Sequence, residues 1–391
     1  MRANPGGQLA PAQVVGRDRL IAQIWRVLDR QSLLLSAERR LGKTSILKKM
    51  LAEPRSGWKP IFRDLEKVHS PIEFVETVIQ DTRDFLGLQK RTGRRLLEAL
   101  QALGGTEIGG ILKLPSQANP QWKTLLVRTI EDLVEDTTQD RIVFFWDEVP
   151  LMLYNVKKAA GEQVAMEMLD TLRSLRQTHV SLRMIFTGSI GLHNVLTSLK
   201  RAGYANDPTN DMYTVDVPAL DLDDATALAR NLLDGESLRT RDLETTTEVI
   251  ARTVDCLPFF IHHVVDSIAK EGNEATPAIA ADVVARCLTA PQDPWHLRYY
   301  RERIDTYYES GERRLALMVL DIVATTSQPL TFAEIRQQLS ETNPPDPESL
   351  RSMLDLVQRD HYLLQDQSGR YRFRFEVIAR HWRLYRGLSE G

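Results

Sequence analysis

The sequence has few cysteines and no long apolar run, and both shortages narrow the class of protein. Only Cys256 and Cys287 occur in 391 residues, with no CxxC pair and no Cys/His cluster, which argues against a disulfide framework or a zinc site. No apolar run approaches the ~18 residues that a membrane-spanning helix needs. The opening residues, MRANPGGQLAPAQ, lack the apolar core of a signal peptide. We therefore expect a cytoplasmic protein without a membrane partner.

The chain also lacks an excess of charge of one sign. Its 50 Lys and Arg residues are balanced by 53 Asp and Glu residues, which leaves a net charge of −3. Any nucleic-acid surface therefore has to be local. Hydrophobic residues make up 42% of the chain and charged residues 26%, as in ordinary globular proteins, and the length suits two or three domains.

A loop between an apolar run and an amphipathic segment has the features of a phosphate-binding loop. Residues 32–36, SLLLS, are long enough for a buried strand, and residues 44–51, TSILKKML, have helical spacing. Gly42, Lys43 and Thr44 form the second half of the motif GxxxxGK[ST]. In such a loop, main-chain N–H groups and the helix N-terminus bind phosphates. Lys43 is predicted to bind the β- and γ-phosphates, and Thr44 is predicted to bind Mg²⁺.

The opening of this motif departs from the pattern. Ala37 stands where the first glycine is expected, and alanine resists the positive φ that glycine adopts freely. Glu38 adds a carboxylate beside a site for anions, and its neighbours Arg39 and Arg40 are expected to offset its charge. Taken alone, the loop leaves two interpretations open, a chance GKT and a nucleotide site.

A second candidate half of the site follows further along the chain. The apolar run at residues 142–146, IVFFW, leads directly into Asp147 and Glu148. Such a run is typical of a parallel strand buried on both faces, and ligands bind at the carboxyl ends of these strands. Asp147 is predicted to hold Mg²⁺ through water and Glu148 to polarise the attacking water. The alternative is a core strand that ends in a solvated acidic pair.

A third apolar run, residues 181–189, ends in polar residues at the same expected edge. Ser189 is predicted to contact the γ-phosphate or the attacking water, with Thr187 as the second choice; the alternative is ordinary turn chemistry at a strand end. Further strands are predicted at 58–64 and 212–220, with helical patterns between the strands. This alternation predicts a three-layer α/β fold with a parallel sheet.

Four motifs in chain order, VVGRDRLIAQIW, AERRLGKTS, FFWDEVP and FTGSIGL, resemble those of the AAA+ P-loop ATPases. The resemblance is nearest to the archaeal-type ATPase branch, close to the origin-recognition and STAND groups, whose loop tends to read GPRRxGKT. The arginine pair and GKT match, and the opening Gly-Pro does not. The resemblance covers residues 14–269. It implies a P-loop ATPase core in residues 1–220, an all-helical lid in 221–290, and a winged-helix domain with its linker in 291–391.

The resemblance implies ATP and Mg²⁺ as cofactors and completes the nucleotide site. Adenine is expected to pack on the segment before the first helix. The lid pattern GGxPxxL keeps its proline, Pro258, while Asp255 and Cys256 replace the glycines. The predicted nucleotide-binding residues are Val15, Gly16, Arg17, Arg39, Arg40, Leu41, Gly42, Lys43, Thr44, Ser45 and Pro258. The predicted metal ligands are Thr44 and Asp147.

The resemblance also implies an arginine finger. AAA+ proteins place it where residues 194–204 stand, and it reaches the γ-phosphate of a neighbouring subunit, so a homo-oligomer is expected. Arg201 is the candidate; the alternative is a solvated basic helix end that the helix dipole favours. The predicted catalytic residues are Glu148, Ser189 and Arg201.

The end of the chain predicts a winged helix, with helices at 312–326, 331–339 and 347–361 and a hairpin at 362–375. Arginines outnumber acids in residues 370–386, as phosphate contacts require. The third helix carries several acids and is a poor reader of the major groove, so DNA binding and a protein-binding or autoinhibitory role both stay open. The predicted nucleic-acid contacts are Arg370, Arg372 and Arg374.

These features predict an ATP-binding and ATP-hydrolysing molecular switch that couples nucleotide state to DNA or a partner protein through the winged helix. The alternative is a nucleotide-stabilised scaffold or winged-helix regulator with weak or no ATPase activity. The departures at Ala37 and Glu38 favour the alternative. The intact Lys43, Asp147 and Glu148 favour the enzyme.

Overall fold

The chain divides into two compact units. A computed structural model describes residues 1–86, 106–108, 111–113, 121–137, 140–188, 191–201, 203–204, 206–272, 274–340 and 345–389. The first unit comprises residues 17–37 and 43–217, and the second comprises residues 1–16, 38–42 and 218–391. The short segment 38–42 therefore groups with residues far from it in the sequence.

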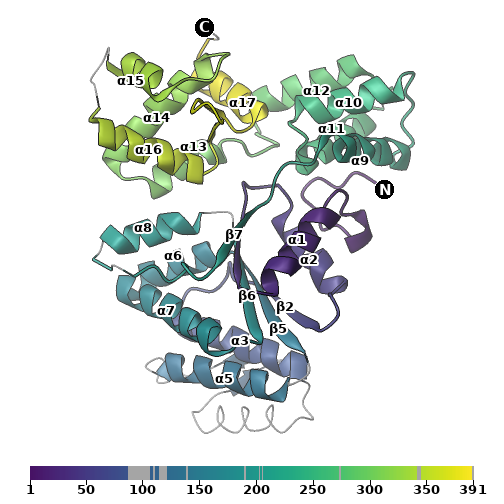
Figure 1. The fold of residues 1–391 in the computed structure, drawn as a ribbon. Coiled ribbons are helices and arrows are strands. Elements are labelled where there is room, and N and C mark those ends of the chain that lie inside the picture. The colour runs from purple at the N-terminus through teal and green to yellow at the C-terminus, as the bar shows by residue number, and fades with distance from the viewer. Residues whose placement is uncertain are drawn as a thin grey trace. The chain divides into compact units, whose positions relative to one another are not determined.

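The first unit contains a five-stranded sheet (Figure 1). Its strands are β1 (Leu33–Ser36), β2 (Trp58–Asp64), β5 (Arg141–Asp147), β6 (Leu182–Thr187) and β7 (Tyr213–Asp216), in the order β2-β5-β6-β1-β7. Every pairing in this sheet is parallel. The carboxyl ends of the strands consequently meet at one edge, and the predicted parallel α/β fold is confirmed.

Helices cover both faces of this sheet, with α1 and α2 on one face and α6 and α7 on the other (Figure 1). The helices are α1 (Asp18–Leu28), α2 (Lys43–Ala52), α3 (Pro71–Leu86), α5 (Trp122–Asp136), α6 (Val149–Ala160), α7 (Glu162–Thr178) and α8 (Leu192–Arg201). A hairpin of β3 (Thr106–Ile108) and β4 (Ile111–Lys113) lies in the chain between α3 and α5. Residues 87–105, 109–110 and 114–120 lie outside the described residues.

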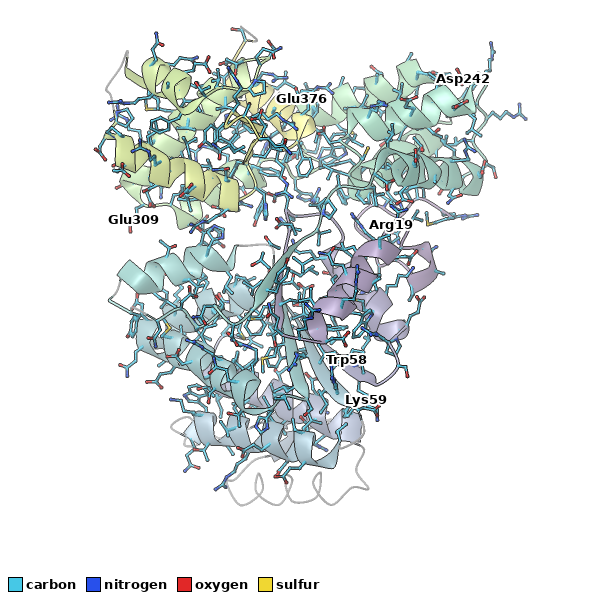
Figure 2. All side chains as sticks on the ribbon, viewed as in Figure 1. Arg19, Trp58, Lys59, Asp242, Glu309 and Glu376 are labelled. Carbon is cyan, nitrogen blue, oxygen red and sulfur yellow. The ribbon has the colours of Figure 1, made fainter. Side chains whose placement is uncertain are left out.

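Strand β5 shows why its sequence is apolar throughout. Phe144 and Trp146 belong to the core shared with α3, α5, α6 and α7. Phe145 lies between them in sequence and packs on the other face, with its ring centroid 6.1 Å from that of Trp25 in α1. Trp58, at the start of β2 and labelled in Figure 2, also packs on Trp25, with ring centroids 5.8 Å apart. Because both faces are covered, β5 has no polar face, and its first carboxylate comes where the strand ends.

The second unit is mostly helical. Its elements are the 3₁₀ turn η1 (Pro11–Gln13), α9 (Leu222–Gly235), α10 (Leu243–Thr253), α11 (Pro258–Glu271), α12 (Pro277–Thr289), α13 (Tyr299–Tyr307), α14 (Ser310–Thr325), α15 (Phe332–Ser340), α16 (Pro347–Arg359), β8 (Leu363–Gln365), β9 (Tyr371–Phe373) and α17 (Glu376–Arg386). Strands β8 and β9 pair antiparallel, and Leu330 adds a bridge to Tyr371. No helix in the described part of the chain is both long and apolar enough to cross a membrane.

Helix caps in this unit follow from local sequence. Asp221 accepts the N–H of Asp224 at 2.8 Å and begins α9, as its position in the sequence predicts. A capping box begins α15, because Thr331 N donates to Glu334 Oε2 at 2.7 Å and Glu334 N donates to Thr331 Oγ1 at 3.3 Å. Asp242, which is labelled in Figure 2, accepts the N–H of Thr245 and caps α10 as Asp221 caps α9. Each cap satisfies an N–H group that a helix leaves unpaired.

The first residues of the chain are held by α11 and by the end of α9. Ala3 N donates to Glu236 Oε1 at 2.7 Å, and Asn4 N donates to His262 Nδ1 at 3.1 Å. Burial lowers the pKa of His262 to about 4, so the imidazole is neutral at neutral pH and its Nδ1 can accept. A buried histidine in an apolar helix here serves as a hydrogen-bond acceptor for main chain.

Candidate functional site

The predicted phosphate-binding loop has the strand, loop and helix context that its motif requires. The loop follows β1, and α2 begins at Lys43. The backbone of Gly42 has φ of +88°, a region that glycine adopts without strain. The Lys43 side chain is buried and its Nζ donates to the carbonyl of Ala37 at 2.8 Å. Leu41 is fully buried and Ser45 is half-buried.

The backbone at Ala37 does not adopt the positive φ that alanine resists. Ala37 is not among the described residues with positive φ, whereas Arg40 has φ of +72° and Gly42 has φ of +88°. A glycine is therefore not required at the motif's first position in this loop. The unfavourable backbone conformation lies at Arg40, where a left-handed residue costs about 1–2 kcal/mol.

The start of α2 and the end of β5 are joined by a short hydrogen bond. Thr44 Oγ1 donates to Asp147 Oδ2 at 2.5 Å. Burial raises the pKa of the Asp147 carboxyl, while the Thr44 hydroxyl, the Lys43 charge and the main-chain N–H of Glu148 act in the opposite direction. The two residues predicted as metal ligands therefore lie together, with the predicted phosphate-binding lysine near them.

These two side chains fit the predicted Mg²⁺. Hydroxyl and carboxylate oxygens are the hard ligands that Mg²⁺ prefers, and Mg²⁺ bound with a nucleotide takes few ligands from protein because waters and phosphate oxygens complete its shell. The described residues contain no group of three or more His, Cys, Asp or Glu side chains that could hold a metal. A metal bound by Thr44 and Asp147 would therefore have to take most of its ligands from water and phosphate.

Glu148 lies between β5 and α6 in a left-handed backbone conformation, with φ of 58° and ψ of 32°. For a residue other than glycine this conformation is strained, and such strain clusters at functional sites. Its Oε2 lies 3.3 Å from the position of a Cβ built on Gly188. The carboxylate therefore points toward the end of β6, next to the edge where Asp147 lies.

The end of β6 places Thr187 between the two halves of the site. Thr187 is opposite Leu35 of β1, and the preceding residue, Phe186, is opposite Trp146 of β5. Its hydroxyl is buried and has no hydrogen-bond partner within the described part of the chain. A buried hydroxyl without a partner is unfavourable, so this oxygen is suited to a ligand. Ser189, the first choice from the sequence, lies outside the described residues.

Asp64 is an acidic residue that the sequence analysis did not include in the site. It ends β2 directly opposite Asp147, and its charge is one of the factors that raise the pKa of the Asp147 carboxyl. A signal was present in the sequence, since Asp64 ends a predicted strand just as Asp147 does. The pairing of β2 with β5 could not be predicted from that signal.

The two arginines of the loop contact aromatic side chains of the second unit. The Arg39 guanidinium lies 4.7 Å from the ring centroid of Tyr299. The Arg40 guanidinium lies 4.0 Å from that of Phe259 and donates to the carbonyl of Trp295. Burial lowers the pKa of Arg40 to about 10, so it stays charged at neutral pH. Their proposed contacts with nucleotide remain predictions.

The counter-charge for Glu38 comes from far away in the sequence. The Glu38 side chain is 2% exposed, and its Oε1 lies 3.3 Å from Nη1 of Arg303 in α13. The Arg39 main-chain N–H also donates to Glu38 Oε1, at 2.8 Å. The expectation that Arg39 and Arg40 offset this carboxylate therefore missed its ion-pair partner.

The predicted adenine-binding residues differ in their surroundings. Gly16 has φ of +70°, and a Cβ there would lie 2.7 Å from the Asp224 side chain in α9, so only glycine fits. Val15 is half-buried, and Arg17 is buried at the N-terminus of α1. Pro258 is the first residue of α11.

The two residues that end the turn before Leu257 and α11 have the positive φ that glycine adopts freely. Asp255 and Cys256, which replace the glycines of the lid pattern, have φ of 52° and 56°. Asp255 Oδ2 accepts the main-chain N–H of Val377 at 2.7 Å, at the start of α17. The aspartate thus adds a helix cap that glycine lacks, which offsets part of the strain.

Two of the three arginines predicted to bind nucleic acid have partners within the chain. Arg370 lies 3.3 Å from Glu334 in an ion pair, and Arg374 Nη1 donates to His361 Nδ1 at 2.8 Å. Arg372 is exposed. Arg201 is the last residue of α8, and its side chain is not described.

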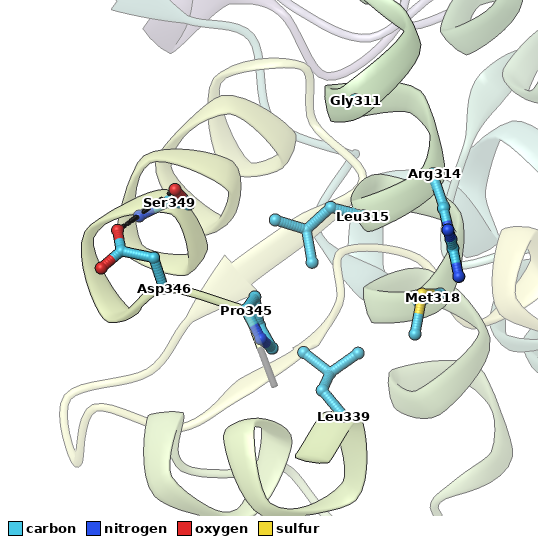
Figure 3. A pocket seen from close by; sticks show the side chains of 8 residues that line it. All are labelled: Gly311, Arg314, Leu315, Met318, Leu339, Pro345, Asp346 and Ser349. Carbon is cyan, nitrogen blue, oxygen red and sulfur yellow. Dashed lines mark hydrogen bonds between the residues drawn. The ribbon is translucent and has the colours of Figure 1, made fainter. Parts of the chain in front are cut away.

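A pocket of about 260 Å³ lies in the second unit among α14, α15 and α16 (Figure 3). Its lining is formed by Gly311, Arg314, Leu315, Met318, Leu339, Pro345, Asp346 and Ser349. Asp346 Oδ2 accepts the N–H of Ser349 at 2.9 Å, so this acid caps α16. The pocket contains none of the predicted site residues.

No protein-family model and no curated protein sequence matches the chain. Among solved structures, a Walker-type ATPase of Pyrococcus abyssi matches with a TM-score of 0.66 and 15% identity over 98% of this chain and 100% of that chain. The ORC2 protein of Aeropyrum pernix, solved in ADPNP–ADP complexes, matches with a TM-score of 0.56 and 10% identity over 97% of each chain. At these identities the likeness shows the fold alone, which this chain shares with both proteins over nearly its whole length.

Proposed function

We propose that the chain is an ATP-binding and ATP-hydrolysing molecular switch of the AAA+ type. The observation that carries the proposal is the hydrogen bond between Thr44 and Asp147, with Lys43 beside it and Glu148 next in the chain. These are the residue types that bind and hydrolyse a nucleoside triphosphate, at the sheet edge where ligands of parallel α/β folds bind. The nucleotide complexes of the A. pernix protein support the same class of ligand.

In this proposal the triphosphate binds at the N-terminus of α2. The main-chain N–H groups of the loop and the helix dipole favour the phosphates, and the Lys43 ammonium exchanges the Ala37 carbonyl for phosphate oxygens. Thr44 and Asp147 hold Mg²⁺, which supplies charge neutralisation of the phosphates when bound. The Asp147 carboxyl, whose pKa is raised by burial, gains a second cation beside Lys43.

Hydrolysis is assigned to the strand ends beside that position. Glu148 accepts a hydrogen bond from the attacking water and polarises it for in-line attack on the γ-phosphorus. Thr187 donates its unpartnered hydroxyl to the γ-phosphate or the water, a role that Ser189 shares. Arg201 of a second copy stabilises transition-state charge, so the active form is a homo-oligomer.

The switch acts through the end of the chain. Helices α14, α15 and α16 and the hairpin β8–β9 occur in the order of a winged helix. The exposed Arg372 is the foremost candidate for a DNA phosphate. Arg370 and Arg374 already have partners within the chain, which favours a partner protein over DNA for this surface.

The enzymatic proposal is tested by ATP turnover. The wild type is expected to hydrolyse ATP only with Mg²⁺, and Glu148→Gln is expected to lower turnover by about 10²–10⁴-fold while nucleotide still binds. Binding with equal, negligible turnover in both proteins would support the alternative, a nucleotide-stabilised scaffold or winged-helix regulator.

The DNA output is tested by duplex binding at several salt concentrations. If DNA is the partner, affinity falls steeply with salt and Arg372→Gln weakens it. Arg351→Gln is the matched control, because Arg351 lies on α16 and forms an ion pair with Glu348. Absence of duplex binding at low salt with ATP present would leave the partner-protein form of the proposal.

A further inference from the structure

Glu38 brings a carboxylate to the phosphate-binding loop. It follows Ala37, whose carbonyl accepts the Lys43 ammonium at 2.8 Å. An acid one residue away from that carbonyl repels a polyphosphate unless its charge is compensated. The Glu38 side chain is nevertheless buried. Its negative charge disfavours the proposed ligand and therefore has to be compensated by a positive charge elsewhere in the protein.

Arg303 supplies that compensation within a buried network of the second unit. Its Nη1 lies 3.3 Å from Glu38 Oε1, and its Nη2 lies 3.5 Å from Asp360 Oδ1. The guanidinium also lies 4.7 Å from the ring centroid of Tyr362. Asp360 is held in turn by Tyr308, whose hydroxyl donates to Asp360 Oδ2 at 2.6 Å. Both charged side chains of the Glu38–Arg303 pair are 2% exposed, so water does little to screen them.

The network keeps Arg303 charged. Burial alone would lower the pKa of the Arg303 guanidinium, but the pull of Tyr362, Asp360 and Glu38 holds it well above its ordinary value. A buried carboxylate that has lost its cation is strongly unfavourable. Glu38 is therefore held by the ion pair with Arg303, within the segment 38–42 that groups with the second unit.

We propose that Arg303 is a positioning residue for the phosphate-binding loop, which fixes the Glu38 side chain and compensates its charge. The proposal rests on the proposed ATP-binding function. It explains how a loop with an acid at its second position still suits a polyanion. It also makes ATP affinity depend on a residue of α13, outside the loop motif and the P-loop core.

The test is a double-mutant cycle on the affinity for Mg·ATP, measured by titration of folded, full-length protein. Arg303→Met is expected to weaken binding at least about tenfold, because Glu38 then repels the phosphates without compensation. Adding Glu38→Gln in the same chain is expected to restore affinity to within about threefold of wild type. Glu38→Gln alone is expected to change affinity less than about threefold, since Arg303 already compensates the charge.

Tyr308→Phe is the matched control, since it removes a hydrogen bond from the same network without touching Glu38. It is expected to lower the melting temperature and to leave the affinity for Mg·ATP unchanged. If Arg303→Met does not fold, the same cycle is run with Arg303→Lys, which keeps the charge but not both contacts and is expected to show a smaller effect with the same rescue.

Three outcomes separate the proposals. Lys43-dependent ATP binding that Arg303→Met or Arg303→Lys leaves unchanged would overturn the positioning role and leave the proposed function intact. A double variant no better than Arg303→Met would also overturn it, because damage to the fold alone is not rescued by Glu38→Gln. Absence of ATP binding by the wild type overturns the proposed function, and the positioning role with it.

Discussion

Buried polar groups at one place in each compact unit differ in how completely they are paired within the protein. At the sheet edge of the first unit, Asp147 carries a pKa raised by burial and Thr187 keeps a hydroxyl without a described partner. In the second unit, Asp360 is enclosed by a guanidinium and a phenol. Under the proposed function, the polar groups of the first place are completed by a ligand, and Asp360 is paired within the protein.

We therefore expect substitutions of similar residues to have opposite effects in the two places. Where polar groups are incompletely matched, removing one should impair binding or turnover and leave the fold stable. Where they are matched, removing one should destabilise the fold. The same substitution made in both units therefore distinguishes the two kinds of site.

The largest expected difference comes from replacing one buried aspartate in each unit by asparagine. Asp360→Asn should lower the free energy of unfolding by about 3–5 kcal/mol, because Arg303 loses a buried counter-charge. Asp147→Asn should change it by less than about 1 kcal/mol, since burial already disfavours that charge. Urea unfolding at neutral pH measures both. Equal losses would contradict the contrast.

The next effect is a pH dependence in the second unit. The pKa of His262 is about 4 in the folded chain and ~6.5 when unfolded. Between these values the unfolded chain binds more protons, so stability falls as pH drops from 6.5 toward 4, by at most about 3 kcal/mol. Unfolding curves of wild type and His262→Asn across this range should converge at low pH. A constant difference between them would contradict the neutral, buried imidazole.

The smallest effect compares two buried threonines. Thr247 donates its hydroxyl to the Leu243 carbonyl at 2.8 Å, so Thr247→Val should cost about 1 kcal/mol. Thr187→Val should cost nothing or stabilise the chain, because its hydroxyl has no described partner. It should instead lower ATP turnover about tenfold. Loss of stability without loss of turnover in Thr187→Val would place this hydroxyl in the structure rather than the site.

The sequence predicted the parts of the site that depend on local pattern. The run before Asp147 is apolar because β5 is covered on both faces, and the residues around Gly42 need a strand, a tight loop and a helix. Those requirements leave a signature within a few residues. Placing Thr44 beside Asp147 followed from the rule that parallel strands end at one edge.

The parts that sequence reasoning missed depend on distant residues. Arg303 follows Glu38 by 265 positions, and no local pattern marks the pair. Helix α17 was interpreted only as an arginine-rich tail, although its buried Val377, Ile378 and Trp382 have helical spacing. Two of its arginines pair within the chain, Arg383 with Glu376 and Arg386 with Asp321.

The positions where another residue replaces an expected glycine also could not be interpreted from the sequence alone. The sequence showed that Ala37 and Cys256 stand where the resembling family has glycine, but not which position needs a positive φ. The structure gives φ of 56° to Cys256 and no positive φ to Ala37. Whether a missing glycine matters is decided by the path of the backbone, which composition does not reveal.

Titration of Mg·ATP into wild type, Lys43→Ala and Lys49→Ala tests the central claim most directly. Lys49 lies on the same helix and pairs with Asp18 at 3.0 Å, so it is a matched control. We expect wild type and Lys49→Ala to bind Mg·ATP with the same affinity. We expect Lys43→Ala to bind it at least about 100-fold more weakly. Equal affinity in all three proteins, or no binding by the wild type, would contradict it.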